Sequence, residues 1–381
     1  MSDRCVYFRI TDVVFSVANH KLEFIAPVKP RVLFISGREI TYIRNRVLLA
    51  ALEKFSDVTV LTGKGRNIPF RTLTGLIRFI TYAQKYDICW AGFYGQPLAL
   101  LLSLIQRNPV ILDAYISTYD TLCEDRVVFH PQSLLGRLAY WLDQKSCQRA
   151  SVVITDTQAN SRYFAQIFGV PEEKLRVVYV GCDESLFYPR PNTLSPSNCC
   201  EVFYYGSFLP LHGTEILIRA CVLLKNRRDI HITIGGTGPQ FPKIRQMVKD
   251  LDLRNVNLVG WIPTDQLPVY IARASICVGG HFSTIPKASR VISTKTFQFL
   301  AMRKPTIVGD NPATRELFTP GVHVYAVPMG DPKALANAIL CLSDNHTLRD
   351  FIASNGYELF KTHLSIHAIA KQLEVLCTSV S

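Results

Sequence analysis

The stretch Lys287–Glu316, KASRVISTKTFQFLAMRKPTIVGDNPATRE, is more informative about this chain than any other. It starts as a cation-rich loop, continues as a short helix, becomes an apolar strand that ends at Gly309, and then begins a second helix. Lys287, Arg290 and Lys295 lie just before the first helix or in its first turn, where the helix N-terminus adds partial positive charge. We expect such a place to bind a diphosphate and the ribose attached to it.

Two further polar residues of this stretch join the candidate site. Lys295 and Gln298 are three residues apart, so one helical face presents a cation and an amide together. Glu316 lies where the second helix begins and is taken as a further substrate contact. A solvated basic loop is the simpler interpretation of an isolated run of charges. The apolar strand and the second polar loop that follow here favour a binding site instead.

The strand inside this stretch belongs to a series of short apolar segments that alternate with helical patterns. Short segments that are apolar throughout and often β-branched are typical of strands buried on both faces of a parallel sheet. In this half of the chain the expected strands are Val202–Tyr205, Ile230–Ile234, Val256–Leu258, Ile276–Val278, Thr306–Val308 and Val322–Val327. The expected helices are Thr214–Lys225, Pro239–Asp250, Gln266–Ala274 and Pro332–Leu342.

The first half of the chain shows the same alternation. Its expected strands are Arg31–Ser36, Val58–Thr62, Ile88–Phe93, Val110–Ala114, Val152–Thr155 and Leu175–Val180. Its expected helices are Ile43–Phe55, Phe70–Lys85, Leu134–Cys147 and Asn160–Phe168. A repeated βα alternation predicts parallel sheets, so the fold class is α/β with two doubly wound, Rossmann-like domains.

A linker separates the two series. The run Pro189–Asn198, PRPNTLSPSN, carries three prolines and no apolar period. We therefore expect a first domain over 31–188, a linker over 189–199 and a second domain over 200–345. C-terminal helices within 346–381 would pack across both domains, and residues 1–30 form an extension in which an added hairpin is one option. Two such domains face a cleft, where ligands bind beyond the carboxyl ends of the strands.

The composition of the chain limits the classes of partner but does not identify a single one. The chain has 381 residues, is 48% hydrophobic and carries a formal charge of +12. That charge suits an anionic small molecule, a membrane surface or a nucleic acid. The eleven cysteines include no CxxC pair and no Cys/His cluster with zinc spacing. No metal site is therefore expected, and most cysteines are interpreted as core residues in a reducing compartment.

The chain shows no sign of secretion or membrane insertion. Its first residues, MSDRCVYFRITDVVFSV, alternate polar and apolar and lack the plan of a signal peptide. The longest apolar run, Pro97–Ile105, is too short to span a bilayer. We expect a cytoplasmic protein, either free or peripheral to a membrane.

One expected helix, Phe70–Lys85, could decide whether the protein is free or peripheral to a membrane. Arg71, Arg78 and Lys85 recur every seven residues along it, beside apolar residues. This spacing places the cations along one side, which could set the domain against anionic lipid. An ordinary amphipathic helix with a solvated basic face is the alternative.

A glycine-containing turn follows the first strand of the second domain. In Tyr205–Gly213, YGSFLPLHG, the glycines Gly206 and Gly213 allow backbone N–H groups to approach a ligand. Ser207 and His212 can donate hydrogen bonds to phosphate oxygens. An ordinary strand-to-helix turn is the alternative.

A second glycine turn, GGTGP, contains Gly236 and also lies between a strand and a helix. The third glycine of GxGxxG is missing, and no acidic residue ends the next strand, Val256–Leu258. The turn is therefore a weak dinucleotide signature, and we interpret it as a glycine turn facing the cleft.

Loops of the first domain supply candidates for the acceptor side. Gly37 follows the first expected strand, and the run from Asp113 to Asp120, DAYISTYD, begins at the carboxyl end of the fourth. A loop rich in carboxylates and hydroxyls at a strand end could bind a polyol acceptor or supply a base. Asp113 and Asp120 are the preferred pair because they lie nearest the predicted cleft. A polar surface loop with an N-cap aspartate is the alternative.

With these residues in view, the chain resembles the retaining glycosyltransferases of the GT-B fold, group 1 (family 4). The resemblance runs from about Arg31 onward and is strongest from Tyr205 to Asp331. The segments that carry it are YGSFLPLHG, GGTGP, GWIP, KASRVISTKTFQFLA, GDNPATREL and VPMGDPKALANAI. Together these segments are specific, although singly none is.

The resemblance implies transfer of a sugar from a nucleotide-diphosphate donor, held by the second domain, to an acceptor held by the first. It implies retention of configuration and no metal or other cofactor. It places Gly206, Ser207 and His212 by the diphosphate, with Arg290 and Lys295 as further phosphate partners. These cations would neutralise the departing diphosphate, which makes them candidate catalytic residues.

The resemblance also assigns the rest of the donor site. It places Gln298 by the ribose, and the turn Gly260–Pro263, with Trp261, near the base. Many members have an Arg and a Lys in the first glycine turn, where this chain has Ser207 and His212. Many also have two glutamates eight residues apart, where this chain has Arg290 and Gln298. Gln298 can hydrogen-bond a ribose but carries no charge.

The leading interpretation is a glycosyltransferase that acts on a saccharide or lipid-linked acceptor and builds a polysaccharide or glycolipid. A catalytically weak sugar-nucleotide-binding protein of the same fold is the alternative. Net charge alone favours a nucleic-acid binder, and because no RNA or DNA module is present we expect no nucleic-acid partner. The chain has no GxSxG elbow, Walker loop or HExxH, which excludes the hydrolase, P-loop and zincin interpretations.

Overall fold

The structure, a computed structural model, describes residues 29–65, 67–82, 84–191 and 199–380, together with the backbone of residues 6–10, 13–18 and 21–25. Of the predicted linker, residues 192–198 lie outside these ranges, as does part of the N-terminal extension. Three antiparallel strands are described in that extension, so two hairpins replace the single one considered from the sequence. They are β1 (Val6–Ile10), β2 (Val13–Ala18) and β3 (Lys21–Ile25).

The first large sheet has six parallel strands in the order β5-β4-β6-β7-β8-β9. Its strands are β4 (Arg31–Ser36), β5 (Asp57–Thr62), β6 (Ile88–Ala91), β7 (Val110–Asp113), β8 (Val152–Thr155) and β9 (Leu175–Val177). Its α-helices are α1 (Ile43–Leu52), α2 (Ile68–Ile80), α3 (Gln96–Ile105), α4 (Leu134–Arg149) and α5 (Gln158–Phe168). A π-helix, Asp120–Asp125, precedes α4, and a 3₁₀-helix, Glu172–Lys174, precedes β9.

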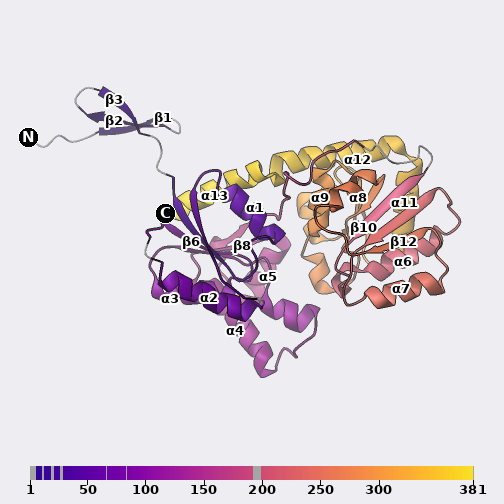
Figure 1. Cartoon of the computed structure of the whole chain (residues 1–381), viewed down its shortest axis with the longest axis horizontal. Helices are drawn as coiled ribbons and strands as arrows, with labels where there is room; N and C mark the ends of the chain where they lie inside the picture. The colour runs from indigo at the N-terminus through magenta and orange to yellow at the C-terminus, as the bar shows by residue number, and fades with distance from the viewer. Residues whose placement is uncertain are drawn as a thin grey trace, which may run out of the picture.

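The second large sheet also has six parallel strands, in the order β12-β11-β10-β13-β14-β15. Its strands are β10 (Cys200–Tyr205), β11 (Ile230–Gly235), β12 (Val256–Gly260), β13 (Ile276–Val278), β14 (Thr306–Asp310) and β15 (Tyr325–Pro328). Its α-helices are α6 (Thr214–Leu223), α7 (Phe241–Asp250), α8 (Leu267–Arg273), α9 (Thr294–Ala301), α10 (Pro312–Leu317) and α11 (Pro332–Asp344). Two parallel sheets with helices between their strands confirm the predicted α/β fold class (Figure 1).

Alternation along the strands sorts the core of the first domain into two layers. Val32 and Phe34 of β4 pack on one face of the sheet, with α1. Leu33 and Ile35 pack on the other face, with residues of α3, α4 and α5. Because both faces are covered by helices, the strands are apolar throughout, which is the pattern that revealed them in the sequence.

The C-terminal helices connect the two domains. They are α12 (His346–Leu359) and α13 (Ile366–Val380), with a π-helix, Phe360–Leu364, between them. Ile352 of α12 lies in the core of the second domain, whereas Ile369 and Leu373 of α13 lie in the core of the first. Figure 1 shows these helices, in yellow, running along both domains.

Most cysteines behave as small core residues, as predicted. Cys89, Cys147, Cys182, Cys221 and Cys277 are buried within the hydrophobic cores. Burial raises the pKa of the Cys89 thiol to about 12, so this side chain stays protonated. None of the helices in the described part of the chain is long and apolar enough to cross a membrane.

Candidate active site

A cavity of about 540 Å³ opens between the two domains. Tyr42, Tyr115 and Asp156 of the first domain line one side of it, each beyond the end of a strand or at the start of a helix. The second domain contributes its two glycine turns and the start of α9. The cavity therefore lies where ligands bind in open α/β sheets, beyond the carboxyl ends of the strands.

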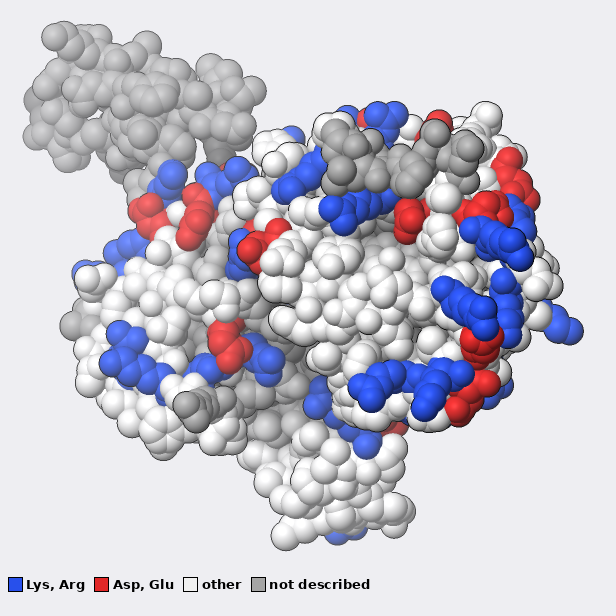
Figure 2. All heavy atoms as spheres, turned by 45° about the vertical axis from the view of Figure 1, so that its right-hand side comes forward, with Lys and Arg blue, Asp and Glu red and all other residues white. Residues whose placement is uncertain are grey.

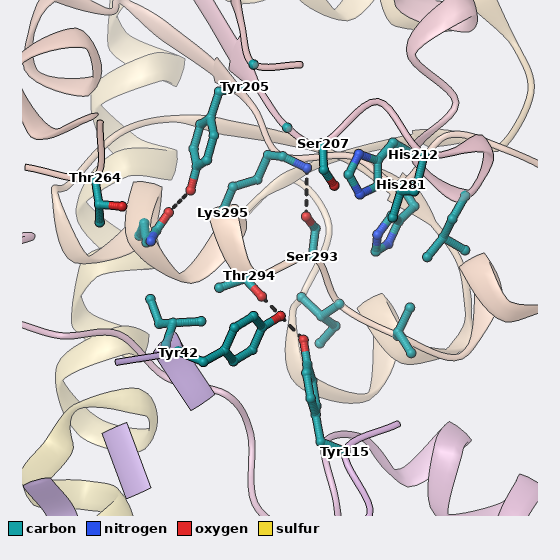
Figure 3. Close-up of a pocket in the computed structure, with 18 of the residues that line it drawn as sticks. Tyr42, Tyr115, Tyr205, Ser207, His212, Thr264, His281, Ser293, Thr294 and Lys295 are labelled. Atoms are coloured by element: carbon teal, nitrogen blue, oxygen red, sulfur yellow. Dashed lines mark hydrogen bonds between the residues drawn. The ribbon is translucent and has the colours of Figure 1, made fainter. Parts of the chain in front are cut away.

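Lys295 is a buried cation in the wall of this cavity. It is 4% exposed, and its Nζ donates a hydrogen bond to the Ser293 Oγ at 2.8 Å (Figure 3). The Nζ also lies 5.0 Å from the centre of the Tyr204 ring. Burial lowers the pKa of Lys295 to about 7. Because none of the ion pairs found among the described residues includes Lys295, an anion in the cavity would relieve the cost of burying its charge.

Two histidines lie beside this lysine. The rings of His212 and His281 are 5.5 Å apart, both line the cavity, and Figure 3 shows them on the same side of it as Ser207 and Lys295. Burial, followed by the charge of Lys295, lowers the pKa of both rings, to about 3 for His281. Within the described chain, the Nδ1 atoms of both rings are buried without a hydrogen-bond partner. Two neutral imidazoles and an ammonium thus converge on one corner, which suits an oxygen-rich anion.

The two glycine turns pack against each other at the same corner. Gly236 has a φ of +116°, and a Cβ at this position would lie 1.9 Å from the carbonyl oxygen of Gly206. Only glycine therefore permits this approach. Ser207 follows in the same turn and lines the cavity with both glycines. Gly213 lies outside the cavity wall; its φ is +65°, and a Cβ there would meet the Ser283 nitrogen at 2.4 Å.

Gln298 and Trp261 also line the cavity. Gln298 is 3% exposed, and its Oε1 accepts a hydrogen bond from the hydroxyl of Tyr205 (Figure 3). This bond fixes the orientation of the amide. Trp261, just after β12, is 71% exposed, so its ring is open to a ligand at the mouth of the cavity.

Lys287 and Arg290, the two cations before α9, bridge the domains. Arg290 donates to the Oδ1 of Asp120 at 2.8 Å, and the Nζ of Lys287 lies 3.1 Å from the Oδ2 of the same carboxylate. Asp125 and Glu124 lie 3.6 and 3.8 Å from these cations. Asp120, predicted as a possible base, is thus the counter-ion of two cations. Of these residues Lys287 and Asp125 line the cavity, whereas Arg290 and Asp120 do not.

The structure corrects the expectation that Asp113 faces the cleft. Its side chain is buried, lies outside the cavity wall and accepts hydrogen bonds from Arg44 at 2.8 and 3.1 Å. The same guanidinium donates to the carbonyl oxygens of Val178 and Tyr179. Asp113 ends β7, and α1 places Arg44 directly against it. This carboxylate therefore forms an internal ion pair instead of facing an acceptor.

Gly37 and Glu316 also lie outside the cavity wall. A Cβ at Gly37 would lie 2.3 Å from the carbonyl oxygen of Tyr94, so this glycine permits close packing of two loops. Glu316 accepts hydrogen bonds from the backbone nitrogens of Gln158 and Ala159, at 2.6 and 2.9 Å. It thereby caps α5 of the first domain from α10 of the second, which holds the two domains together.

Several cavity residues were not among those predicted. The hydroxyl of Tyr115 lies 3.5 Å from the Thr294 Oγ1, across the domain boundary (Figure 3). Asp156 accepts a hydrogen bond from Asn160 at 2.8 Å, and burial raises its pKa to about 6. Its place directly after β8 is the same signal that pointed to the other strand-end loops. His281 follows β13 in no recognisable motif, so no sequence signal could have selected it.

The described residues include no group of three or more His, Cys, Asp and Glu side chains placed to share a metal ion. The polar groups of the cavity corner are instead an ammonium, two imidazoles and hydroxyls.

Both domains match known families. Residues 18–186 match Glycosyltransferase Family 4, and residues 200–345 match Glycosyl transferases group 1. The first match contains the sheet β4 to β9 and the second contains the sheet β10 to β15. The cavity therefore lies between the two matched domains.

Relatives of known name are distant. The chain is 23% identical to the alpha-D-kanosaminyltransferase of Streptomyces kanamyceticus over 299 residues, 74% of this chain and 72% of the relative. It is 26% identical to the lipopolysaccharide core biosynthesis glycosyltransferase LpsD of Rhizobium meliloti (strain 1021) over 181 residues, 47% of this chain and 50% of that protein.

Solved structures share the whole fold. Anabaena Alr3699/HepE in complex with UDP and glucose superposes with a TM-score of 0.72 at 18% identity, covering 92% of this chain and 100% of that one. The sucrose-phosphate synthase of Thermosynechococcus elongatus gives a TM-score of 0.72 at 17% identity, with 92% and 99% covered. At these identities the likeness concerns the fold.

Proposed function

Because the chain belongs to the glycosyltransferases, with a family 4 domain followed by a group 1 domain, we propose that it transfers a sugar from a nucleotide-diphosphate donor to a saccharide or lipid-linked acceptor with retention of configuration. The buried corner of Lys295, His212 and His281, in a cavity between the two domains, is the observation that carries this proposal. It combines one unpaired cation with neutral hydrogen-bond donors.

The donor diphosphate binds at this corner. The ammonium of Lys295 faces the phosphate oxygens, while the His212 ring and the hydroxyl of Ser207 donate hydrogen bonds to them. Negative charge on the diphosphate grows as the glycosidic bond breaks, and fixed donors in a buried site stabilise that charge most. Lys295 is therefore the residue we assign to stabilisation of the leaving group.

The rest of the donor follows the wall of the cavity. The amide of Gln298, oriented by Tyr205, binds the ribose, and the exposed ring of Trp261 lies near the base. The Anabaena protein Alr3699/HepE has been solved with UDP-glucose, which supports testing UDP-hexoses first. The donor's sugar then extends toward the first domain.

The acceptor binds on the side of Tyr42, Tyr115 and Asp156. Two phenol hydroxyls and a carboxyl group with a pKa of about 6 suit the hydroxyls of a sugar. Relatives named for the biosynthesis of lipopolysaccharide core and of amylovoran support a saccharide or lipid-linked acceptor within polysaccharide or glycolipid assembly.

Retention follows if the acceptor oxygen attacks from the face that the diphosphate leaves. The acceptor hydroxyl then forms the new bond to the anomeric carbon, the bond to the diphosphate breaks, and the departing phosphate oxygen takes the acceptor's proton. Lys295 stabilises the charge throughout this step. We place the reaction in the cytoplasm and propose that it needs no metal ion.

A thermal-shift screen across UDP-, GDP- and ADP-sugars tests donor binding, because a ligand that binds only the folded state raises the melting temperature. Release of nucleotide in the presence of acceptor saccharides then tests transfer, and proton NMR of the product reports its anomeric configuration. Absence of any shift with the whole panel would contradict the proposed donor site.

A second candidate function is favoured by Gln298. This side chain is neutral where many members of the resembled class carry a glutamate, so a protein that binds sugar nucleotides without turning them over is the alternative. Binding of a nucleotide sugar with no release of nucleotide, for every acceptor supplied, would favour it.

A further inference from the structure

Three helices of the first domain present apolar side chains to the outside. Helices α2, α3 and α4 lie together at the lower side of this domain in Figure 1, on the same face of the sheet. Their strongly exposed apolar residues are Phe70, Leu73, Ile77 and Ile80 on α2, Leu101, Leu104 and Ile105 on α3, and Leu134, Leu135, Leu138 and Trp141 on α4. A contiguous exposed apolar surface usually marks a site where the protein contacts another protein or a membrane.

An ordinary amphipathic helix buries its apolar face, but helix α2 exposes much of its apolar face. It ends at Ile80, so Lys85 is not part of it, and Arg71 is only 9% exposed because it pairs with Glu39 at 2.8 Å. Ile80, in contrast, is 67% exposed. The expectation of a solvated basic face is therefore wrong for Arg71, and the helix turns much of its apolar side outward.

The start of α4 forms a projecting lobe with a well-defined backbone. The Ser133 Oγ accepts a hydrogen bond from the Gly136 nitrogen at 3.1 Å, and a Cβ at Gly136 would lie 2.4 Å from the His130 carbonyl oxygen. Leu134 is 82% exposed at this lobe and Val127, just before it, is 72% exposed. In Figure 2 the lowest part of the molecule, which corresponds to this lobe, is almost entirely uncharged. Apolar side chains are thus held outward on a capped helix.

The exposed charges on these three helices are of one sign. Within helices α2, α3 and α4 the single carboxylate is Asp143, which is buried and accepts a hydrogen bond from Ser117 at 2.7 Å. Arg78, Arg137 and Arg149 are exposed on the same helices. A shallow hollow at the ends of α2 and α3 adds further basic and polar side chains, from Lys85, Tyr86, Gln106, Arg107 and Asn108, while Arg31 of the same hollow is paired with Asp87 at 2.7 Å.

We propose that the face made by α2, α3 and the start of α4 rests on a lipid bilayer that contains anionic phospholipids. The projecting leucines, led by Leu134, enter the boundary between headgroups and acyl chains, and the arginines lie at the level of the phosphates. A bilayer with anionic headgroups fits this face because exposed arginines accompany the apolar side chains and the one carboxylate on the three helices, Asp143, is buried. This docking would hold the acceptor side of the cavity near the membrane.

Co-sedimentation with vesicles tests the proposal on the full chain. We expect binding to phosphatidylcholine vesicles that contain phosphatidylglycerol, about tenfold stronger than to phosphatidylcholine alone, and weaker at high salt. Leu134→Glu with Leu138→Glu should weaken this binding by at least about tenfold. The matched control is Val375→Glu on α13, a residue that is 73% exposed and belongs to the helix on the opposite face of the sheet. This control should bind like the parent protein.

Tryptophan fluorescence provides a second test that does not depend on the amount of protein that sediments with the vesicles. In a Trp261→Phe background the remaining tryptophans are the buried Trp90 and the half-exposed Trp141. Emission from Trp141 should shift to shorter wavelength when vesicles with phosphatidylglycerol are added. Failure to bind either vesicle type overturns the proposal. So does a dimer in solution that the Leu134→Glu and Leu138→Glu substitutions disperse, because a second copy would then cover this face.

Discussion

Lys287 and Arg290 lie in the segment before α9, and Lys295 lies in the first turn of α9, yet the two sets of cations have opposite surroundings. The first two face Asp120 of the other domain, at 3.1 and 2.8 Å. Lys295 faces a serine hydroxyl and two neutral imidazoles, and burial lowers its pKa to about 7. A cation with a carboxylate partner is already balanced, whereas an unpaired buried cation is favoured by an incoming anion. The difference separates residues that join the domains from the residue that receives the diphosphate.

The largest effect should come from removing the unpaired cation. Lys295→Met keeps much of the side-chain volume but removes the charge, so UDP or the preferred nucleoside diphosphate should bind about 3 kcal/mol more weakly, on the order of a hundredfold. Isothermal titration calorimetry measures this loss. The exposed Lys249 of α7, changed to Met, is the control and should bind normally. Normal binding by Lys295→Met would mean that the two sets of cations have been assigned the wrong way round.

Removing a paired cation should affect stability more than binding. Arg290→Met leaves Asp120 with Lys287 as its remaining close partner and should lower the free energy of unfolding by about 2 kcal/mol. Urea denaturation measures this change, and the double variant with Asp120→Asn should lose less than the sum of the single losses. The affinity for the nucleotide should change less than in Lys295→Met. A hundredfold loss of affinity in Arg290→Met would instead make Arg290 a phosphate partner.

The pH dependence of binding sharpens the same distinction. Lys295 has a pKa of about 7 without ligand, and a bound diphosphate favours its charged form. Nucleotide affinity should therefore fall as the pH rises above 7, by up to about tenfold per pH unit until the pKa of the complex is reached. Calorimetry between pH 7 and 9, in two buffers of different ionisation heat, should detect proton uptake on binding. In Lys295→Met this uptake should disappear, and its persistence would assign the proton to another group.

A smaller effect is expected at the ribose. Gln298→Glu would give the Tyr205 hydroxyl a charged acceptor and the ribose a stronger one, so donor affinity should rise by about 1 kcal/mol, roughly fivefold. The rate of nucleotide release with acceptor present shows whether turnover rises as well. A loss of binding would show that the amide donates a hydrogen bond that a carboxylate cannot replace.

The smallest effect should follow removal of divalent cations. Because Lys295 and neutral donors face the diphosphate, addition of EDTA should leave nucleotide release unchanged within about twofold. Full recovery of a lost rate by added Mg²⁺ would contradict this expectation.

The fold could be predicted from the sequence because its strands are buried on both faces of each sheet. A strand of this kind consists of consecutive apolar residues, which are easily recognised in a sequence. Element bounds were less certain. The last strand was predicted over Val322–Val327 but β15 begins at Tyr325, since Val322 and His323 close a turn onto Thr319. A turn that is formed by backbone hydrogen bonds requires no particular side chains, so it is hard to recognise in a sequence.

Side-chain roles were harder to predict because they depend on partners far along the chain. Asp113 was expected to face the cleft, but Arg44, on a helix of the same domain, holds it inside. Glu316 was expected to contact substrate, but it caps the helix that starts near Gln158. His281 has no motif and becomes noticeable only when it lies against His212. Gly206 and Lys295 were predicted correctly to line the cavity because their positions depend on a single turn or helix.

A crystal structure with the nucleoside diphosphate that binds most tightly would show directly whether Lys295 receives the diphosphate. We predict a phosphate oxygen about 3 Å from the Lys295 Nζ, a hydrogen bond from His212 to the diphosphate, and Arg290 still paired with Asp120. A diphosphate bound to Arg290 and Lys287, with the pairs to Asp120 broken and Lys295 out of contact, would contradict it.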